Sequence, residues 1–326
     1  MSKKVTLADV AARAGCSPTM VSYVLRNGER GKSAPGTRKR IYAAVKELGY
    51  RVDYAARALR YGDSRMIGVL FPRVGGYIYE LLLALDKHIH QAGYMPLCSF
   101  FDVVPDHRKS STEAMEKMLS MNVAAVISSS RVEVAQISTP LIIWGNKYDS
   151  HDCVYPDKAA FGKDVIERVW SLGHRKIGIA GILNDFAYYD PMVEFLKAQR
   201  IFDPAYLFRT SGRQEHGAEV FEYFMNLPEV PTVIICHSDE LAMGVIRAAR
   251  INGVDIPGQL SIVGADHLRA GEMLLPSLAT YDQHFDLMAQ KLTEVTLKRI
   301  ADAALPLQQI GIQMEFIPGE SLQSIK

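Results

Sequence analysis

Basic side chains are concentrated in the first 65 residues, and chemistry with phosphate is the first function that they suggest. This segment holds 14 Lys and Arg against 5 Asp and Glu, a net charge of +9, whereas the whole chain carries +1. The remaining 261 residues therefore carry −8. A basic segment joined to an acidic body is typical of a nucleic-acid-binding module, although a solvated basic arm has the same charge. The order of residues within the segment has to decide between the two.

Motifs for catalysis or metal binding are missing from the sequence. No Gly-x-Gly-x-x-Gly follows a strand-like stretch, and neither a complete phosphate-loop motif nor a Gly-x-Ser-x-Gly occurs. His88 and His90 are two residues apart, which on a helix directs them to different sides. The four cysteines are far apart and are expected to be reduced thiols. We therefore predict no catalytic residue, no metal site, no cofactor and no enzymatic activity.

Three short helices are predicted in the basic segment. Thr6 can cap a helix over residues 7–14, and Gly15 can end it in a left-handed turn. Ser17 and Pro18 are typical of the start of a second helix. A third helix is expected over about residues 37–48, with Ser33 replacing Ala34 as its cap. The glycine turn indicates a helix-turn-helix, whose second helix can enter the major groove of DNA.

Several short stretches of this segment occur in a familiar order: Val5-Thr-Leu-Ala-Asp-Val-Ala, Ala14-Gly-Cys-Ser-Pro, Met20-Val-Ser-Tyr-Val-Leu, Thr37-Arg-Lys-Arg and Glu47-Leu-Gly-Tyr. They resemble the DNA-binding domain of the LacI/GalR (lactose-repressor) family of transcriptional regulators. The resemblance implies that base edges are contacted by Thr19, Met20 and Tyr23, the last at a position where family members commonly have arginine. It also implies that phosphates are held by Thr6, Ser17, Ser22 and basic side chains such as Arg38. For Met20 the alternative is packing within the small core of the helices.

A short segment from Asp53 to Arg60 follows, too short to stay helical alone in water. In the family that the chain resembles, such hinge segments fold on operator DNA as paired helices whose leucines wedge a base step open in the minor groove. Leu59 matches that leucine, and Ala56 would allow the two helices to approach closely. The alternative is a plain linker helix whose leucine packs on the core.

From Met66 onward, apolar strand-like stretches alternate with amphipathic helices, which indicates parallel sheets of βαβ units. We expect strands over residues 66–71, 95–101, 124–129, 141–144, 176–181, 232–236 and 261–264, with helices over 79–92, up to 121, and near 191–200. They form two series, so two lobes with a cleft at the carboxyl ends of their strands are predicted.

Three further stretches resemble the periplasmic-binding-protein-like core of the same family: Leu172-Gly-His-Arg-Lys-Ile, Ser238-Asp-Glu-Leu-Ala-Met-Gly and Pro276-Ser-Leu-Ala-Thr. The predicted fold is an N-terminal all-α helix-turn-helix head plus an α/β core of two doubly wound parallel-sheet lobes. The domains are 1–50 for DNA binding, 51–65 for the hinge and 66–326 for effector binding and dimerisation. The resemblance implies these effector-binding residues: Tyr77, Tyr79, Trp144, Tyr188, Ser238, Asp266 and Phe285.

Aromatic rings beside a carboxylate and a hydroxyl suit a polyhydroxyl ligand, although any of the tyrosines or the tryptophan could instead be core. Tyr188 stands where family members often have an arginine that grips the sugar, and Gly145 where an acid is frequent. Basic residues near the predicted cleft edges leave an acidic or phosphorylated ligand open: Arg73, Lys158, His237 and His267. The effector is therefore expected to be a sugar, a sugar acid or a sugar phosphate.

Together these features predict a cytoplasmic homodimer that binds palindromic double-stranded operator DNA and represses a carbohydrate-use operon. No apolar segment suits export or a membrane span, so no membrane partner is expected. Two alternatives are a sugar-binding transport protein, which would lack the basic head, and a regulator that has lost its response to ligand.

Overall fold

The chain divides into two units, Met1–Ser64 and Arg65–Lys326, and each has a hydrophobic core of its own. The computed structural model describes residues 5–27, 32–51, 64–73, 75–102, 107–130, 132, 138–182, 186–210 and 214–325. Most of the predicted hinge, with Ala56 and Leu59, lies outside these residues. The roles of Ala56 and Leu59 therefore stay predictions.

The first unit contains the three predicted helices, α1 (Leu7–Ala14), α2 (Pro18–Asn27) and α3 (Pro35–Leu48). Gly15 and Gly49 end α1 and α3 in left-handed conformations, with φ of 64° and 63°. The expectation that Ser33 caps the third helix is wrong. This helix begins at Pro35, which needs no amide hydrogen there, and its N-cap is Ala34.

Small apolar residues hold the three helices together. The side chains buried between them are Val10, Ala11, Ala14, Val21, Val24, Ile41 and Ala44. Two polar contacts join α1 to α3: Arg13 forms an ion pair with Glu47 at 2.7 Å, and Arg40 Nε donates to the carbonyl of Ala14 at 3.2 Å. These contacts hold α1 against α3, while Val21 and Val24 pack α2 into the same cluster and leave Thr19 and Met20 exposed.

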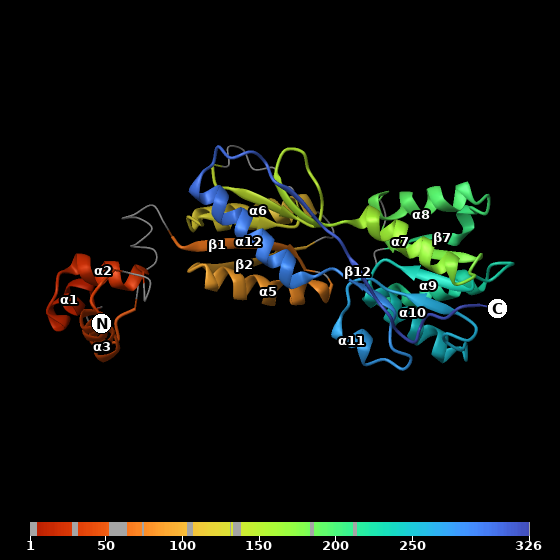
Figure 1. The fold of residues 1–326 in the computed structure, drawn as a ribbon, viewed down its shortest axis with the longest axis horizontal. Coiled ribbons are helices and arrows are strands. Elements are labelled where there is room, and N and C mark those ends of the chain that lie inside the picture. The colour runs from red at the N-terminus through yellow and green to blue at the C-terminus, as the bar shows by residue number, and fades with distance from the viewer. Residues whose placement is uncertain are drawn as a thin grey trace. The chain divides into compact units, whose positions relative to one another are not determined.

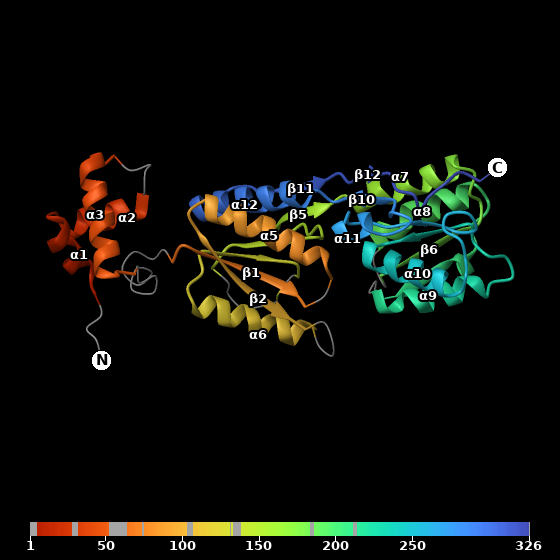
Figure 2. The same cartoon turned by 90° about the horizontal axis from the view of Figure 1, so that it is seen from below.

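The second unit begins with a lobe built on a six-stranded parallel sheet of order β11-β5-β4-β3-β1-β2. Its strands are β1 (Met66–Pro72), β2 (Met95–Phe101), β3 (Ala125–Ser128), β4 (Leu141–Trp144), β5 (Asp152–Pro156) and β11 (Gln309–Ile312). Helices α5 (Tyr77–Gln91) and α12 (Phe285–Ala301) cover one face, and α6 (His107–Ser120) covers the other (Figures 1 and 2). This is the first predicted lobe.

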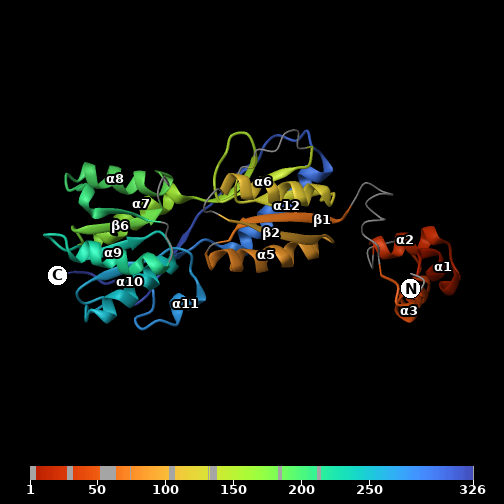
Figure 3. The same ribbon diagram turned by 180° about the vertical axis from the view of Figure 1, so that it is seen from behind.

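The second lobe contains a four-stranded parallel sheet of order β7-β6-β8-β9. Its strands are β6 (Ile177–Ile182), β7 (Leu207–Thr210), β8 (Val233–Cys236) and β9 (Ser261–Val263). Figure 3 shows α7 (Lys158–Ser171) and α8 (Phe186–Ala198) on one face, with α9 (Gly217–Met225) and α10 (Asp239–Ile251) on the other. Short elements complete the lobe: η2 (Pro204–Tyr206), η3 (Gln214–His216) and α11 (Arg269–Glu272).

The chain passes between the lobes three times. It crosses from β5 to α7, returns from β10 (Thr280–Asp282) to α12, and crosses again from β11 to β12 (Glu315–Ile317), which pairs antiparallel with β10. The fold class predicted from the sequence is confirmed. None of the helices within the described residues is both long and apolar enough to cross a membrane.

Candidate functional site

The outer face of α2 carries the side chains predicted to contact base edges. Thr19 and Met20 are exposed at its start, and 37% of Met20 is accessible. Met20 does not belong to the apolar cluster of this unit, so the alternative of core packing has no support in this structure. These two side chains are placed where a helix that enters the major groove presents its first turns.

Tyr23, the third predicted base-contacting residue, also makes contacts within the first unit. Its ring is half-buried against the apolar cluster, and its hydroxyl oxygen accepts a hydrogen bond from the backbone N–H of Lys32 at 2.9 Å. Tyr23 therefore also holds the backbone at Lys32, a role that the sequence alone did not suggest.

Two of the residues predicted to hold phosphates also cap helices. Thr6 donates its hydroxyl to Asp9 Oδ2 at 2.6 Å, and Asp9 N–H donates back to Thr6 Oγ1 at 3.4 Å. Ser17 Oγ accepts from Met20 N–H at 3.2 Å, so its proton can still be donated to a phosphate. Ser22 and Arg38 are half-buried. Capping orients the Ser17 hydroxyl and leaves its proton for a phosphate. Thr6 would first have to break its hydrogen bond to the Asp9 carboxylate before it could donate to a phosphate.

A pair of buried carboxyl groups lies in the second lobe, where β8 and β9 end. Asp266 and Asp239 are 2% and 0% exposed, and Asp239 N–H donates to Asp266 Oδ2 at 3.3 Å. Asp266 also accepts from the amide of Gln283. Asp239 accepts from Thr280 Oγ1 at 2.5 Å and from Leu268 N–H at 2.7 Å. The predicted effector residue Asp266 is thus part of a hydrogen-bonded network.

Burial and mutual repulsion favour the protonated forms of this pair. Burial raises the pKa of Asp239 to about 6. Burial, and then the nearby charge of Asp239, raises the pKa of Asp266 well above its usual range. The raised pKa favours the protonated form of Asp266, in which the carboxyl group can donate a hydrogen bond, and such a donor suits a ligand rich in hydroxyl groups.

The pair should make the core less stable as pH rises. Unfolded, Asp239 loses its proton near its ordinary pKa of 3.8, but folded it keeps the proton to about pH 6. The free energy of unfolding should therefore fall between about pH 4 and 6, by roughly 1–3 kcal/mol from this group. Asp266→Asn, which removes the second buried acid with a raised pKa, should flatten this decrease. Denaturant titrations across this range measure it, and the exposed control Asp302→Asn should keep the wild-type slope; an equal slope in Asp266→Asn would contradict a contribution from Asp266.

The first lobe contributes aromatic residues to the same region. Tyr77 begins α5, and its ring lies 5.8 Å from the ring of Trp144 between centroids. Burial, together with the charges of Asp266 and Glu240, raises the pKa of Tyr77, so its hydroxyl stays protonated. Phe285 begins α12 and packs against the apolar core of the first lobe, to which Trp144 belongs. Tyr77 is therefore the aromatic side chain that the structure places near Asp266.

The remaining predicted effector residues pack within their lobes, cap a helix or are exposed. Trp144 is 5% exposed and donates its indole N–H to Met288 Sδ, which places it in the core of its lobe. Tyr188 is 3% exposed and stacks on Phe161 at 5.4 Å. Ser238 caps α10 by accepting from Leu241 N–H, and Tyr79 is 62% exposed on α5. No interaction in the described residues joins Tyr79 to the others.

The sequence analysis overlooked Asp239 and Glu240, although both stand in the stretch that begins at Ser238. Glu240 Oε1 accepts from the backbone N–H of Gly76 in the first lobe at 2.8 Å. Two acids directly after a buried strand, at the predicted cleft end, were the available signal. Within the described residues, no group of three or more His, Cys, Asp or Glu side chains is placed to hold a metal ion.

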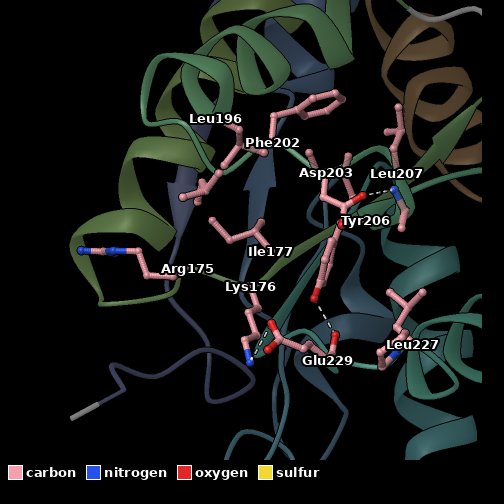
Figure 4. A pocket seen from close by; sticks show the side chains of 14 residues that line it. Arg175, Lys176, Ile177, Leu196, Phe202, Asp203, Tyr206, Leu207, Leu227 and Glu229 are labelled. Atoms are coloured by element: carbon pink, nitrogen blue, oxygen red, sulfur yellow. Dashed lines mark hydrogen bonds and ion pairs between the residues drawn. The ribbon is translucent and has the colours of Figure 1, made fainter.

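Two concave regions lie outside this network. A groove of about 840 Å³ runs between α5 and the chain from β10 to α12. A second cavity, of about 460 Å³, lies beside the first residues of β6. Figure 4 shows Phe202 and Tyr206 among its aliphatic side chains, with Tyr206 donating to the carbonyl of Glu229 and Lys176 paired with the Glu229 carboxylate. Its polar groups thus bond mainly to each other.

Comparison with known proteins finds counterparts for both units. Residues 6–53 match the bacterial regulatory proteins of the lacI family, and residues 166–322 match the periplasmic binding protein-like domain. The HTH-type transcriptional repressor PurR of Haemophilus influenzae is 26% identical over 336 residues, covering 98% of this chain and 99% of its own. The lac repressor dimer bound to operator and the anti-inducer ONPF has a TM-score of 0.81 at 21% identity, covering 98% and 99% of the chains. A complex of the transcriptional regulator CelR with cellobiose has a TM-score of 0.71 at 18% identity, covering 98% of this chain and 100% of the CelR chain.

Proposed function

Because the chain belongs to the lacI family of bacterial regulatory proteins, we propose that it is a transcriptional repressor of a carbohydrate-use operon, controlled by a sugar or sugar derivative bound between its core lobes. The observation that carries the proposal is the exposed start of α2, with Thr19 and Met20, in a capped helix-turn-helix. The protein acts on DNA in the cytoplasm and catalyses no reaction.

A neutral polyhydroxyl effector is favoured over an acidic one. The raised pKa of Asp266 favours a carboxyl group that can donate a hydrogen bond, and Tyr77 offers a ring on which C–H groups can pack. Two of the four basic side chains that would favour an anion pair with acids: Arg73 pairs with Asp102 at 3.0 Å, and His267 pairs with Glu272 at 3.0 Å. The cellobiose in the CelR complex is a neutral polyhydroxyl sugar.

A thermal-shift screen with neutral sugars, sugar acids and sugar phosphates tests the effector class. A neutral sugar that raises the melting temperature of the wild type, with a smaller shift in Asp266→Ala, would support the proposal. A response to phosphorylated sugars alone would overturn the neutral class. No change in melting temperature with any panel member would favour the alternative of a regulator that has lost its response to ligand.

Selection of bound duplexes from a random pool tests the DNA function. An imperfect palindrome is expected, because two-fold symmetry of a dimer is mirrored in its operator. Recovery of no preferred sequence over competitor DNA would overturn the proposal.

Tyr23→Phe should change which operator is preferred, whereas Arg38→Ala should weaken all duplexes about equally. The first removes the hydroxyl of a predicted base-contacting side chain, and the second removes a predicted phosphate contact. A discrimination change of about tenfold or more is expected at one base pair for Tyr23→Phe. Binding to single-base variants of the selected operator measures it, with Tyr42→Phe, 43% exposed on α3, as control. Equal weakening by Tyr23→Phe and Arg38→Ala would remove Tyr23 as a base-contacting residue.

We propose that the groove along α5 is covered by a second copy in a homodimer. Its lining is mixed: Leu83, 51% exposed, and Met273, 84% exposed, lie among charged side chains such as Glu80 and Lys87. Exposed apolar side chains surrounded by polar ones are typical of an interface with a polar rim. Leu83→Asp should shift the protein from dimer to monomer in sedimentation velocity, whereas Ile251→Asp, at a 68% exposed position outside the groove, should not. An unchanged dimer in Leu83→Asp would contradict this assignment.

A further inference from the structure

One hydrogen bond joins the two lobes of the core close to Asp266. Glu240 is the second residue of α10 in the second lobe, and its Oε1 accepts from the backbone N–H of Gly76 at 2.8 Å. Gly76 is the N-cap of α5 in the first lobe. A carboxylate of one lobe thus lies at the first residue of a helix in the other.

The start of α5 is suited to this carboxylate. The N-cap of α5 makes no side-chain capping bond of its own, although the first amides of a helix need acceptors and attract negative charge. Gly76 also makes room for the contact. A Cβ built there would lie 3.0 Å from Glu240 Oε1 and 3.6 Å from Leu268 Cδ1, so a side chain would push the carboxylate away.

The contact bears directly on the predicted effector residues. Tyr77 follows Gly76, and both Asp266 and Glu240 are close enough to act on its hydroxyl electrostatically. Asp266 in turn accepts from the N–H of Asp239, the residue before Glu240. The start of α10 therefore contacts the first lobe through Glu240 and the predicted effector residue Asp266 through Asp239.

We propose that Glu240 is a positioning residue of the effector cleft, which caps α5 from the opposite lobe and so holds the lobes closed with Tyr77 against Asp266. The importance of Glu240 for effector binding rests on the proposed function, but the hydrogen bond between Glu240 and Gly76, here called the latch, is present in the ligand-free protein. A charge-assisted hydrogen bond of this kind should change the ratio of closed to open lobes by about tenfold to a hundredfold.

Hydrogen exchange of the full chain, without ligand or DNA, tests the latch. In Glu240→Ala, peptides covering the start of α5 should exchange at least about tenfold faster than in wild type, relative to peptides from the buried part of α10 in the same sample. A merely local role of Glu240 in its own lobe would not alter exchange in the other lobe. Glu240→Gln, which keeps an acceptor without the charge, should fall between the two.

Two further variants make the result decisive. Gly76→Ala disturbs the same contact from the first lobe and should speed exchange in the same peptides, even if Glu240→Ala destabilises the second lobe. Glu272→Ala removes a carboxylate that pairs with His267 inside the second lobe and should leave α5 unchanged. Wild-type exchange at the start of α5 in both Glu240→Ala and Gly76→Ala would overturn the proposal. Because no operator or effector enters this experiment, its outcome is separate from that of the DNA selection and the sugar screen.

Discussion

Arg299→Ala is expected to lower the free energy of unfolding of the core by about 3–5 kcal/mol, because it leaves a buried carboxylate without its partner. Asp152 in β5 is 2% exposed, and Arg299 in α12 reaches it with Nε at 2.8 Å and Nη2 at 3.0 Å. The same guanidinium donates to the carbonyls of Ala303 at 2.9 Å and Leu305 at 2.6 Å. Its removal therefore releases the chain that leads from α12 into β11 as well.

Denaturant unfolding followed by tryptophan fluorescence measures this effect, since Trp144 and Trp170 both lie in the second unit. Lys291→Ala on the same helix is the matched control. Its partner Glu294 is 40% exposed, and loss of such a surface pair should cost less than about 1 kcal/mol. The double variant Arg299→Met/Asp152→Leu should recover part of the lost stability, because it leaves no unpaired charge. If Arg299→Ala lowers the free energy of unfolding no more than Lys291→Ala does, the buried ion pair between Arg299 and Asp152 is not the source of stability proposed here.

The fold could be predicted from the sequence because its elements follow from local patterns. The strands expected over residues 95–101 and 141–144 have those bounds in the structure, since each is an apolar run that the next helix or turn ends. The third helix of the head begins two residues earlier than expected. Pro35 is compatible with the first helical position, and the preceding residue supplies no side-chain cap.

The candidate cleft could be predicted only in part, because its contacts join residues far apart in the chain. The bond between Gly76 and Glu240 spans 164 positions, and no local pattern specifies it. Aromatic residue type also does not reveal burial. Trp144 and Tyr79 looked alike as candidates, yet 5% of the first and 62% of the second is exposed. Asp266 was identified because its place after a strand end is a feature of the sequence itself.

Operator affinity should fall by about a thousandfold between 50 and 200 mM salt, if a dimer neutralises as few as six phosphates. The basic residues of the head and the donors at the start of α2 would supply such contacts, each of which releases a counterion from the duplex. Measurement of the dissociation constant across this salt range gives the slope. Arg38→Ala should reduce the slope by about one for each protomer, whereas Tyr23→Phe should leave it unchanged while altering the preferred sequence. An operator affinity that does not change with salt would mean that the charge of the first 65 residues does not act on DNA phosphates. The alternative of a solvated basic arm would then be favoured.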